Sequence, residues 1–168
     1  MLQIGFTPLR WACTYGHKEA AQILLEAEAR DDLHSAAARG DTETVEEMLS
    51  TGWDANTSNR GDETPLMWAA NRASGPNHIA VMKLLLQKKA KPDARDQHGF
   101  TALMGASQKG NVDAIRTLVA GRADVNAREP EDDETALMMA MHCARSNAVT
   151  VLLELGAEKP ENFEDPQE

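Results

Sequence analysis

The sequence GFTPLRWACTYGH, residues 5–17, contains a pattern that returns several times along the chain and therefore indicates its fold. Its central part, Thr-Pro-Leu-x-x-Ala, is repeated with small changes at residues 64–69, 101–106 and 135–140. A further copy, without the Thr-Pro pair, occupies residues 33–40. A motif that returns at a nearly constant interval predicts a row of similar structural units, each packed on its neighbours, instead of one large core.

With its period near 33 residues, the motif resembles the T-P-L-H-x-A signature of the ankyrin repeat. The resemblance extends from Gly5 to about Pro160. It implies an all-α fold, an ankyrin-repeat solenoid of about five helix-turn-helix repeats with short β-hairpin fingers between them. It also implies that the repeats hold partners and do not transform substrates.

Each copy carries signals for two antiparallel helices. Thr before Pro suits a helix start, because Thr can cap the helix and Pro fits its first turn. Gly16, Gly40 and Gly110 stand where the first helix must end and reverse, a position that favours a positive φ. Apolar residues at helical spacing follow each of these glycines and predict the second helix.

Two departures from the motif concern its third copy and its histidine. The third copy is four residues longer than its neighbours, and the extra residues fall in a Gly-Pro loop at 72–78, where Asn77 is expected to cap the next helix. Only His34 keeps the histidine of the motif, which in the family is thought to tie neighbouring loops together by hydrogen bonds. Three methionines replace it in later copies and are expected to fill the core: Met67, Met104 and Met138.

The connection between the first two copies is nine residues short of the period, and the missing part is the finger. Residues 18–39 contain no Gly or Pro, so they form either one fused helix, about 33 Å long, or two helices with a break at residues 30–32, where an aspartate caps the second. A fused helix would carry residues 1–30, an N-terminal helix pair, away from the array at 31–160. We then expect the pair to dock on a second copy as a swapped homodimer. Residues 161–168 are expected to form an acidic mobile tail.

Composition limits the class of protein. The net charge is −10, distributed as an acidic, a basic and again an acidic band along the chain. No apolar run reaches membrane-spanning length and no secretory signal is visible, while two cysteines fit a reduced compartment. We therefore expect a cytoplasmic protein, with the nucleus as the alternative, and no membrane partner.

One basic cluster raises the question of nucleic acid. Its members surround the base of one finger: Lys88, Lys89, Lys91 and Arg95. The acidic pI of 4.9 and the lack of a recognition motif argue against nucleic-acid binding. An acidic protein partner, or the chain's own acidic C-terminal segment, fits the cluster better.

Catalytic chemistry is not indicated. The sequence has no phosphate-binding glycine loop, no Ser or Cys with a His at a spacing typical of catalytic sites, and no cluster of metal ligands. The five histidines are scattered over separate copies of the motif. We therefore expect no enzyme, no cofactor, no metal and no small-molecule substrate.

The resemblance implies that partners meet the finger tips and the exposed, concave face of the first helices. Carried over by position, the candidate protein-binding residues are Arg60, Glu63, Asn71, Arg72, Gln97, His98, Phe100, Gln108, Lys109, Glu134 and His142. Phe100 is the sharpest candidate, since exposed aromatic residues often anchor interfaces; packing on an adjacent finger is the alternative. Trp11 and Trp68 are expected to fill the helix layer.

These residues predict a protein-protein interaction module for a macromolecular partner. The alternative is an ankyrin-type inhibitor or regulator of an enzyme such as a kinase. The sequence around Asn126 also resembles the finger sequence that asparaginyl hydroxylases modify in ankyrin proteins. A purely structural role in the finger is the alternative for Asn126.

Overall fold

The structure, a computed structural model, describes residues 33–73 and 75–160. A helix over residues 33–39 comes first. It is followed by α3 (Thr42–Ser50), α4 (Pro65–Arg72), α5 (Pro76–Gln87), α6 (Ala102–Lys109), α7 (Val112–Ala120), α8 (Ala136–His142) and α9 (Ser146–Glu154). The helix pair predicted for 1–30, the start of the fused helix and the acidic tail lie outside the described residues.

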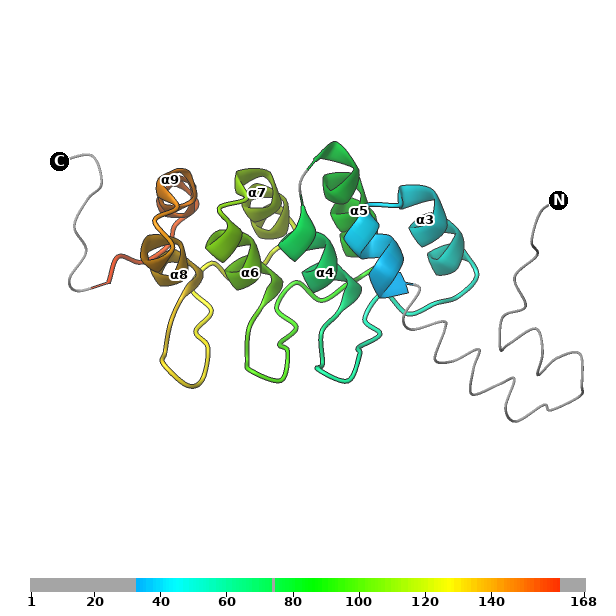
Figure 1. Ribbon diagram of the computed structural model, residues 1–168, viewed down its shortest axis with the longest axis horizontal. Coiled ribbons are helices and arrows are strands. Elements are labelled where there is room, and N and C mark those ends of the chain that lie inside the picture. The colour runs from blue at the N-terminus through cyan, green and yellow to red at the C-terminus, as the bar shows by residue number, and fades with distance from the viewer. Residues whose placement is uncertain (1–32, 74, 161–168) are drawn as a thin grey trace, which may run out of the picture.

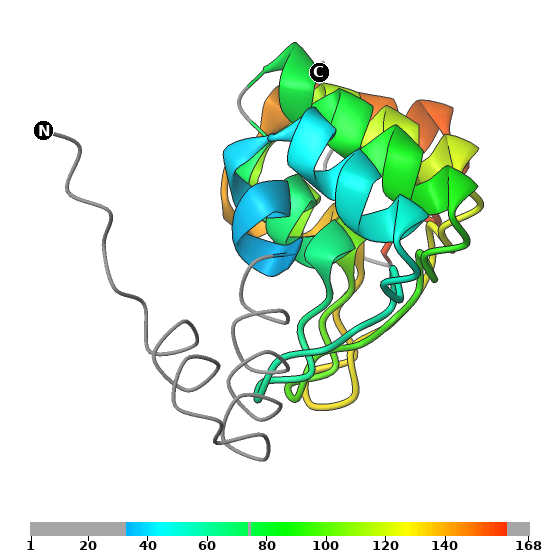
Figure 2. The same cartoon turned by 90° about the vertical axis from the view of Figure 1, so that its right-hand side faces the viewer.

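The helices form two parallel rows, and the loops between repeats project from the helices to the same side (Figures 1 and 2). In the inner row, α4 packs on α6 and α6 packs on α8. In the outer row, α3, α5, α7 and α9 contact each other in sequence, and each inner helix also packs on the outer helix that follows it. The predicted all-α repeat solenoid is therefore confirmed.

Small side chains allow the inner helices to approach one another closely. Ala69, Ala70 and Ala106 have no exposed surface, and leucines such as Leu66 and Leu103 are at most 1% exposed. Since each inner helix has only seven or eight residues, it is too short to be stable by itself in water. Its stability therefore comes from burial against the helices of its own and the neighbouring repeats.

Threonine caps begin the inner helices as predicted. The hydroxyl oxygens of Thr64, Thr101 and Thr135 accept hydrogen bonds from the backbone N–H three residues later, at 3.3–3.4 Å. In return, the backbone N–H groups of Thr64 and Thr101 donate to the sulfur atoms of Met67 and Met104, at 3.4 Å in both cases. These methionines therefore fill the core and also complete the cap.

His34 makes the contact expected of the histidine in the motif. Its Nε2 donates to the carbonyl oxygen of Glu63 in the next repeat at 2.9 Å, and the side chain is 2% exposed. The bond crosses from the first described inner helix to the next finger. It is one of several polar contacts that hold adjacent repeats in register.

A second set of such contacts joins the bases of neighbouring fingers. Side-chain oxygens at equivalent positions accept a backbone N–H from the next repeat: Asn56 from Lys91 at 2.7 Å, Asp93 from Asp124 at 2.8 Å, and Asn126 from Glu158 at 2.9 Å. The Asn126 amide also donates to the carbonyl oxygen of Gly156. Asn126 thus has the structural role that the sequence left open as one alternative.

The expected β-hairpins do not form in the fingers. Among the described residues, sheet pairing is limited to one isolated antiparallel bridge, between Arg128 and Thr135. The finger backbone closes instead by a bond such as that from Asp96 N–H to the Phe100 carbonyl oxygen, at 3.0 Å. Side-chain oxygens take up the other N–H groups, as Asp96 does for His98 and Phe100. Few backbone donors are left to form a ladder between strands.

The turns inside the repeats follow one prediction and correct another. Gly40 and Gly110 have φ values of +70° and +74°, as predicted, and Ala144 occupies the same position in the last repeat at +53°. In the longer repeat, α5 starts at Pro76 with Gly75 as its N-cap and without a side-chain cap. The prediction that Asn77 caps this helix was wrong, because the helix begins at Pro76, two residues earlier than a cap at Asn77 would place it.

Replacing Ala144 with glycine is expected to stabilise the array by about 1 kcal/mol, because the left-handed conformation strains an alanine and glycine adopts it freely. The free energy of unfolding, measured by urea denaturation, should rise by this amount. Gly156→Ala is the reverse control, since Gly156 has φ +95° and no atom lies within 4 Å of an added Cβ. Gly156→Ala should lower the free energy of unfolding by a similar amount. A loss of stability in Ala144→Gly would show that the backbone of Ala144 is not strained.

Candidate functional site

The inner helices and fingers place equivalent side chains in register along one face. Four positions of each repeat recur on this side of the inner row: one at the finger end, one in the middle of the inner helix and two at its C-terminal end. The sets are Glu63, Phe100 and Glu134; Trp68, Gly105 and Met139; Asn71, Gln108 and His142; and Arg72, Lys109 and Cys143. Eight of the eleven predicted binding residues belong to these sets.

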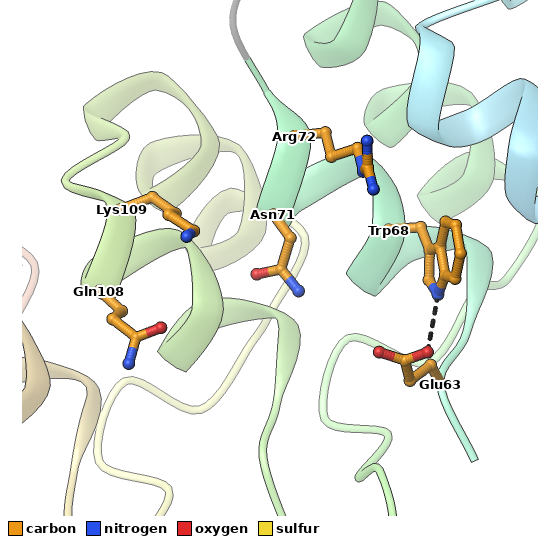
Figure 3. A pocket seen from close by; sticks show the side chains of 6 residues that line it. All are labelled: Glu63, Trp68, Asn71, Arg72, Gln108 and Lys109. Carbon is orange, nitrogen blue, oxygen red and sulfur yellow. Dashed lines mark hydrogen bonds between the residues drawn. The ribbon is translucent and has the colours of Figure 1, made fainter. Parts of the chain in front are cut away.

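A hollow of about 450 Å³ opens on this face between α4 and α6 (Figure 3). Its lining consists of Glu63, Trp68, Asn71, Arg72, Gln108 and Lys109. Five of these six residues were predicted as binding residues from the sequence. The exception is Trp68, which was expected to fill the helix layer and instead lies partly exposed in the hollow.

Gly105 lets one lining residue of the hollow lie close against α6. It occupies in α6 the position that Trp68 occupies in α4. The amide of Asn71 lies where a Cβ on Gly105 would be, and the two would overlap. A glycine at this position of the motif is the signal in the sequence for this close approach.

Trp68 is held in place by a small network. Its Nε1 donates to a carboxylate oxygen of Glu63 at 3.0 Å (Figure 3). The same oxygen accepts the Asn59 amide at 2.7 Å. The His34 ring meets the indole edge-on, with centroids 5.9 Å apart and planes at 76°. The Arg72 guanidinium lies over the indole, 5.8 Å from its centre. Contacts of this kind orient both side chains before any partner binds.

The finger tips carry a second group of predicted residues. Arg60, Gln97 and His98 are exposed, and the Gln97 side chain lies 3.0 Å from the His98 ring nitrogen. The backbone N–H of Gln97 donates to the carbonyl oxygen of Gly61, which links the two fingers at 2.9 Å.

Gly99, in the finger between α5 and α6, touches the finger that follows it. Gly99 is buried and has φ +83°, and the ring of Pro130 occupies the space where a Cβ would stand. The fingers therefore form one connected edge of the concave face.

The remaining predicted residues lie apart from the hollow. In the last described repeat, Glu134 and His142 face each other with 2.8 Å between Oε1 and Nδ1. Phe100 is partly buried and packs against the core, and its N–H donates to Asp96 at 2.9 Å. This arrangement favours the packing alternative for Phe100 over its use as an anchor.

Only some of the charged side chains in the described residues form ion pairs. Within residues 33–73 and 75–160, ion pairs join Arg116 to Glu154, Arg128 to Asp133 and His142 to Glu134. The exposed side chains of Arg39, Arg72 and Lys109 take part in none of these pairs. The part of the chain that the structure covers has no group of three metal-binding side chains and no helix with the length and apolar character to cross a membrane.

The finger of the last described repeat is organised by one carboxylate. Glu129 is 4% exposed, and its oxygens accept the backbone N–H groups of Glu131, Asp132 and Glu134. These bonds, that from Glu131 above all, lower the pKa of Glu129 below its usual 4.5 although burial opposes the shift. A charged carboxylate therefore fixes the loop that carries Glu134.

Comparison with known proteins identifies the repeats. A family model described as "Ankyrin repeats (3 copies)" matches residues 33–129 and 73–162, and one described as "Ankyrin repeat" matches residues 4–31. The chain is 45% identical over 65 residues to the human Ankyrin repeat domain-containing protein 29, which is 38% of this chain and 22% of that protein.

Two longer matches cover most of this chain. It is 30% identical over 155 residues, 90% of its length, to Ankyrin repeat domain-containing protein SAT10 of Stachybotrys chartarum, of which it covers 8%. It is 31% identical over 140 residues, 76% of its length, to the human Transient receptor potential cation channel subfamily A member 1, of which it covers 12%. The chain thus spans less than a quarter of each of these relatives.

Acid should remove the contribution of Glu129 to stability. Because its pKa is lowered in the folded state, the carboxylate stabilises the fold above the usual pKa of 4.5, and this contribution is lost as the pH falls through the lowered value. The difference in unfolding free energy between the native chain and Glu129→Gln should be largest above pH 4.5 and shrink below it. Urea denaturation over a pH series measures it.

Glu131→Gln is the control, since Glu131 is exposed and its carboxylate makes no hydrogen bond among the described residues. It should change stability little at any pH. An equal, pH-independent effect of both substitutions would show that the Glu129 carboxylate has no special role.

Proposed function

The chain belongs to the ankyrin repeat family, and from this premise we propose that it is a protein-protein interaction module whose concave face and finger tips bind a partner protein. The observation that carries the proposal is the hollow between α4 and α6, where an oriented tryptophan lies beside unpaired cations and free amides. Ankyrin repeat domains generally serve as protein-binding modules. Tryptophan and arginine are the residues most often found at the energetic centre of protein interfaces.

The lining of the hollow suits binding and not catalysis. It has two cations, one carboxylate, two amides and an indole. The carboxylate of Glu63 is already engaged by Trp68 and Asn59, so it is not available as a base poised on a substrate. The six lining side chains do not include a nucleophile hydrogen-bonded to a base.

Preorganisation supports the same conclusion. The finger bases are tied by the contacts of Asn56, Asp93 and Asn126, and the finger tips by the bond from Gln97 to Gly61. A surface that is already ordered loses little conformational entropy when a partner binds. Such a rigid face can reach useful affinity with a small contact area.

The compartment belongs to the proposal too. Two cysteines in 168 residues, one of them a free and partly exposed Cys143, fit a reducing environment such as the cytoplasm or the nucleus. The partner is accordingly expected among the proteins of those compartments.

Reversing two charges in the hollow should remove partner binding. We expect the Arg72→Glu/Lys109→Glu variant to lose the proteins that the native chain captures from lysate of its source cells, because both residues line the hollow and are exposed. Quantitative mass spectrometry of the captured proteins measures the loss.

The matched control changes the same charges elsewhere. Lys83 and Lys88 are exposed on the outer row and its end, so Lys83→Glu/Lys88→Glu alters net charge equally without touching the hollow. Capture that depends on the outer pair, or that survives both double variants, would contradict binding through the concave face.

A further inference from the structure

We propose that the concave face recognises an extended acidic segment of a partner protein, with one carboxylate for each repeat and a carboxylate at every third residue of the segment. This inference rests on the proposed function and adds the chemistry and the conformation of the bound segment.

A row of cations lies along the ends of the inner helices. Arg39, Arg72 and Lys109 occupy equivalent positions, at the last residue of the helix at 33–39, of α4 and of α6. All three side chains are exposed, and within the described residues none has an ion-pair partner. Basic residues at a helix end interact favourably with the helix dipole, but this does not neutralise their charge. The row therefore presents one exposed positive charge for each of three successive repeats. Hydrogen bonds from Thr44 and, after them, the charge of Arg39 lower the pKa of Asp41.

The spacing of the repeats sets the spacing of the ligand. Packed helices lie about 8–10 Å apart, so neighbouring cations of the row recur at roughly that interval. A peptide in the extended polyproline II conformation rises about 3.1 Å per residue with three residues per turn, so every third side chain points the same way, at intervals of about 9 Å. Acidic residues at every third position of an extended segment can therefore meet Arg39, Arg72 and Lys109 in turn.

A helical ligand matches the interval too, because seven residues of an α-helix rise about 10 Å. Its backbone N–H and C=O groups are already paired within the helix, however, so it would leave the free amides on this face without backbone partners.

The side chains beside the row suit an extended backbone. Asn71 and Gln108 occupy equivalent positions next to Arg72 and Lys109, and neither side-chain amide is hydrogen-bonded among the described residues. Each amide offers a donor and an acceptor, which an extended peptide needs because its own backbone groups are unpaired. Trp68 adds an aromatic surface and holds the guanidinium of Arg72 in position.

The rest of the face disfavours a continuous polyanion. On the finger side of the hollow lies the carboxylate of Glu63, and the last finger exposes Glu131, Asp132 and Asp133. A nucleic acid, with charge on every residue, would place some of its phosphates against these acids. A short peptide with acids only along the cationic row avoids this repulsion.

Synthetic peptides test the inference directly. The first is a fluorescein-labelled peptide of about nine residues, rich in Pro and Ala to favour the polyproline II conformation, with Glu at every third position; the second has the same composition with its Glu residues adjacent. Fluorescence anisotropy at low salt should show the spaced peptide binding at least about fivefold more tightly, because three exposed ion pairs form instead of one or two. Added salt should weaken the binding of both peptides.

Variants connect the binding to the row. Arg72→Glu/Lys109→Glu should weaken the spaced peptide by at least about tenfold, and Lys83→Glu/Lys88→Glu should leave it unchanged. In the single variant Arg72→Glu, a spaced peptide with Lys in place of its middle Glu should recover affinity. Circular dichroism verifies that each variant keeps its helices.

Several results would overturn the inference: equal affinity for the adjacent-Glu peptide, tighter binding of a helical peptide with Glu seven residues apart, tighter binding of single-stranded DNA, or an equal loss in the outer-row variant. If captured partners depend on Arg72 and Lys109 while no acidic peptide binds, this inference fails and the proposed function stands. If neither depends on them, both fail.

Discussion

The contact between successive inner helices is the constraint on which the rest of the structure depends. These helices have seven or eight residues, so they exist only because each packs on the next. Alanines such as Ala70 and Ala106, with no exposed surface, bring the backbones close. Everything on the concave face follows from this contact, because it sets the interval at which Arg72 and Lys109, or Asn71 and Gln108, recur.

Local signals account for what the sequence predicted correctly. A threonine cap needs only the residues within one turn of it, so Thr64, Thr101 and Thr135 were assigned from the motif. The positive φ values of Gly40 and Gly110 are likewise local properties of a turn. The repeat period then orders these units in space, which is why five of the six residues of the hollow were predicted by position.

The errors have different causes, some in contacts between repeats and some in local competition for the same backbone groups. Trp68 was assigned to the helix layer, but its side chain lies partly exposed in the hollow, where its Nε1 bonds to Glu63 and its ring meets His34 of the preceding repeat. The fingers were expected to form hairpins, but the carboxylates of Asp96 and Glu129 take up the N–H groups that a ladder would use. Asn77 was expected to cap α5, yet Pro76 already begins that helix. The longer loop also has a role that its length did not reveal, since His78 bonds to the Ala38 carbonyl oxygen of the preceding repeat at 3.0 Å.

The contact between Gly99 and Pro130 limits how far this array can be treated as interchangeable modules. Pro130 fits only because the preceding finger has a glycine without a Cβ at that point. Transplanting either repeat next to a generic neighbour would leave the proline ring colliding with a side chain or facing an empty space. Recombination within the gene would therefore have to transfer both repeats together, and a designer who extends the array should insert new units outside this pair.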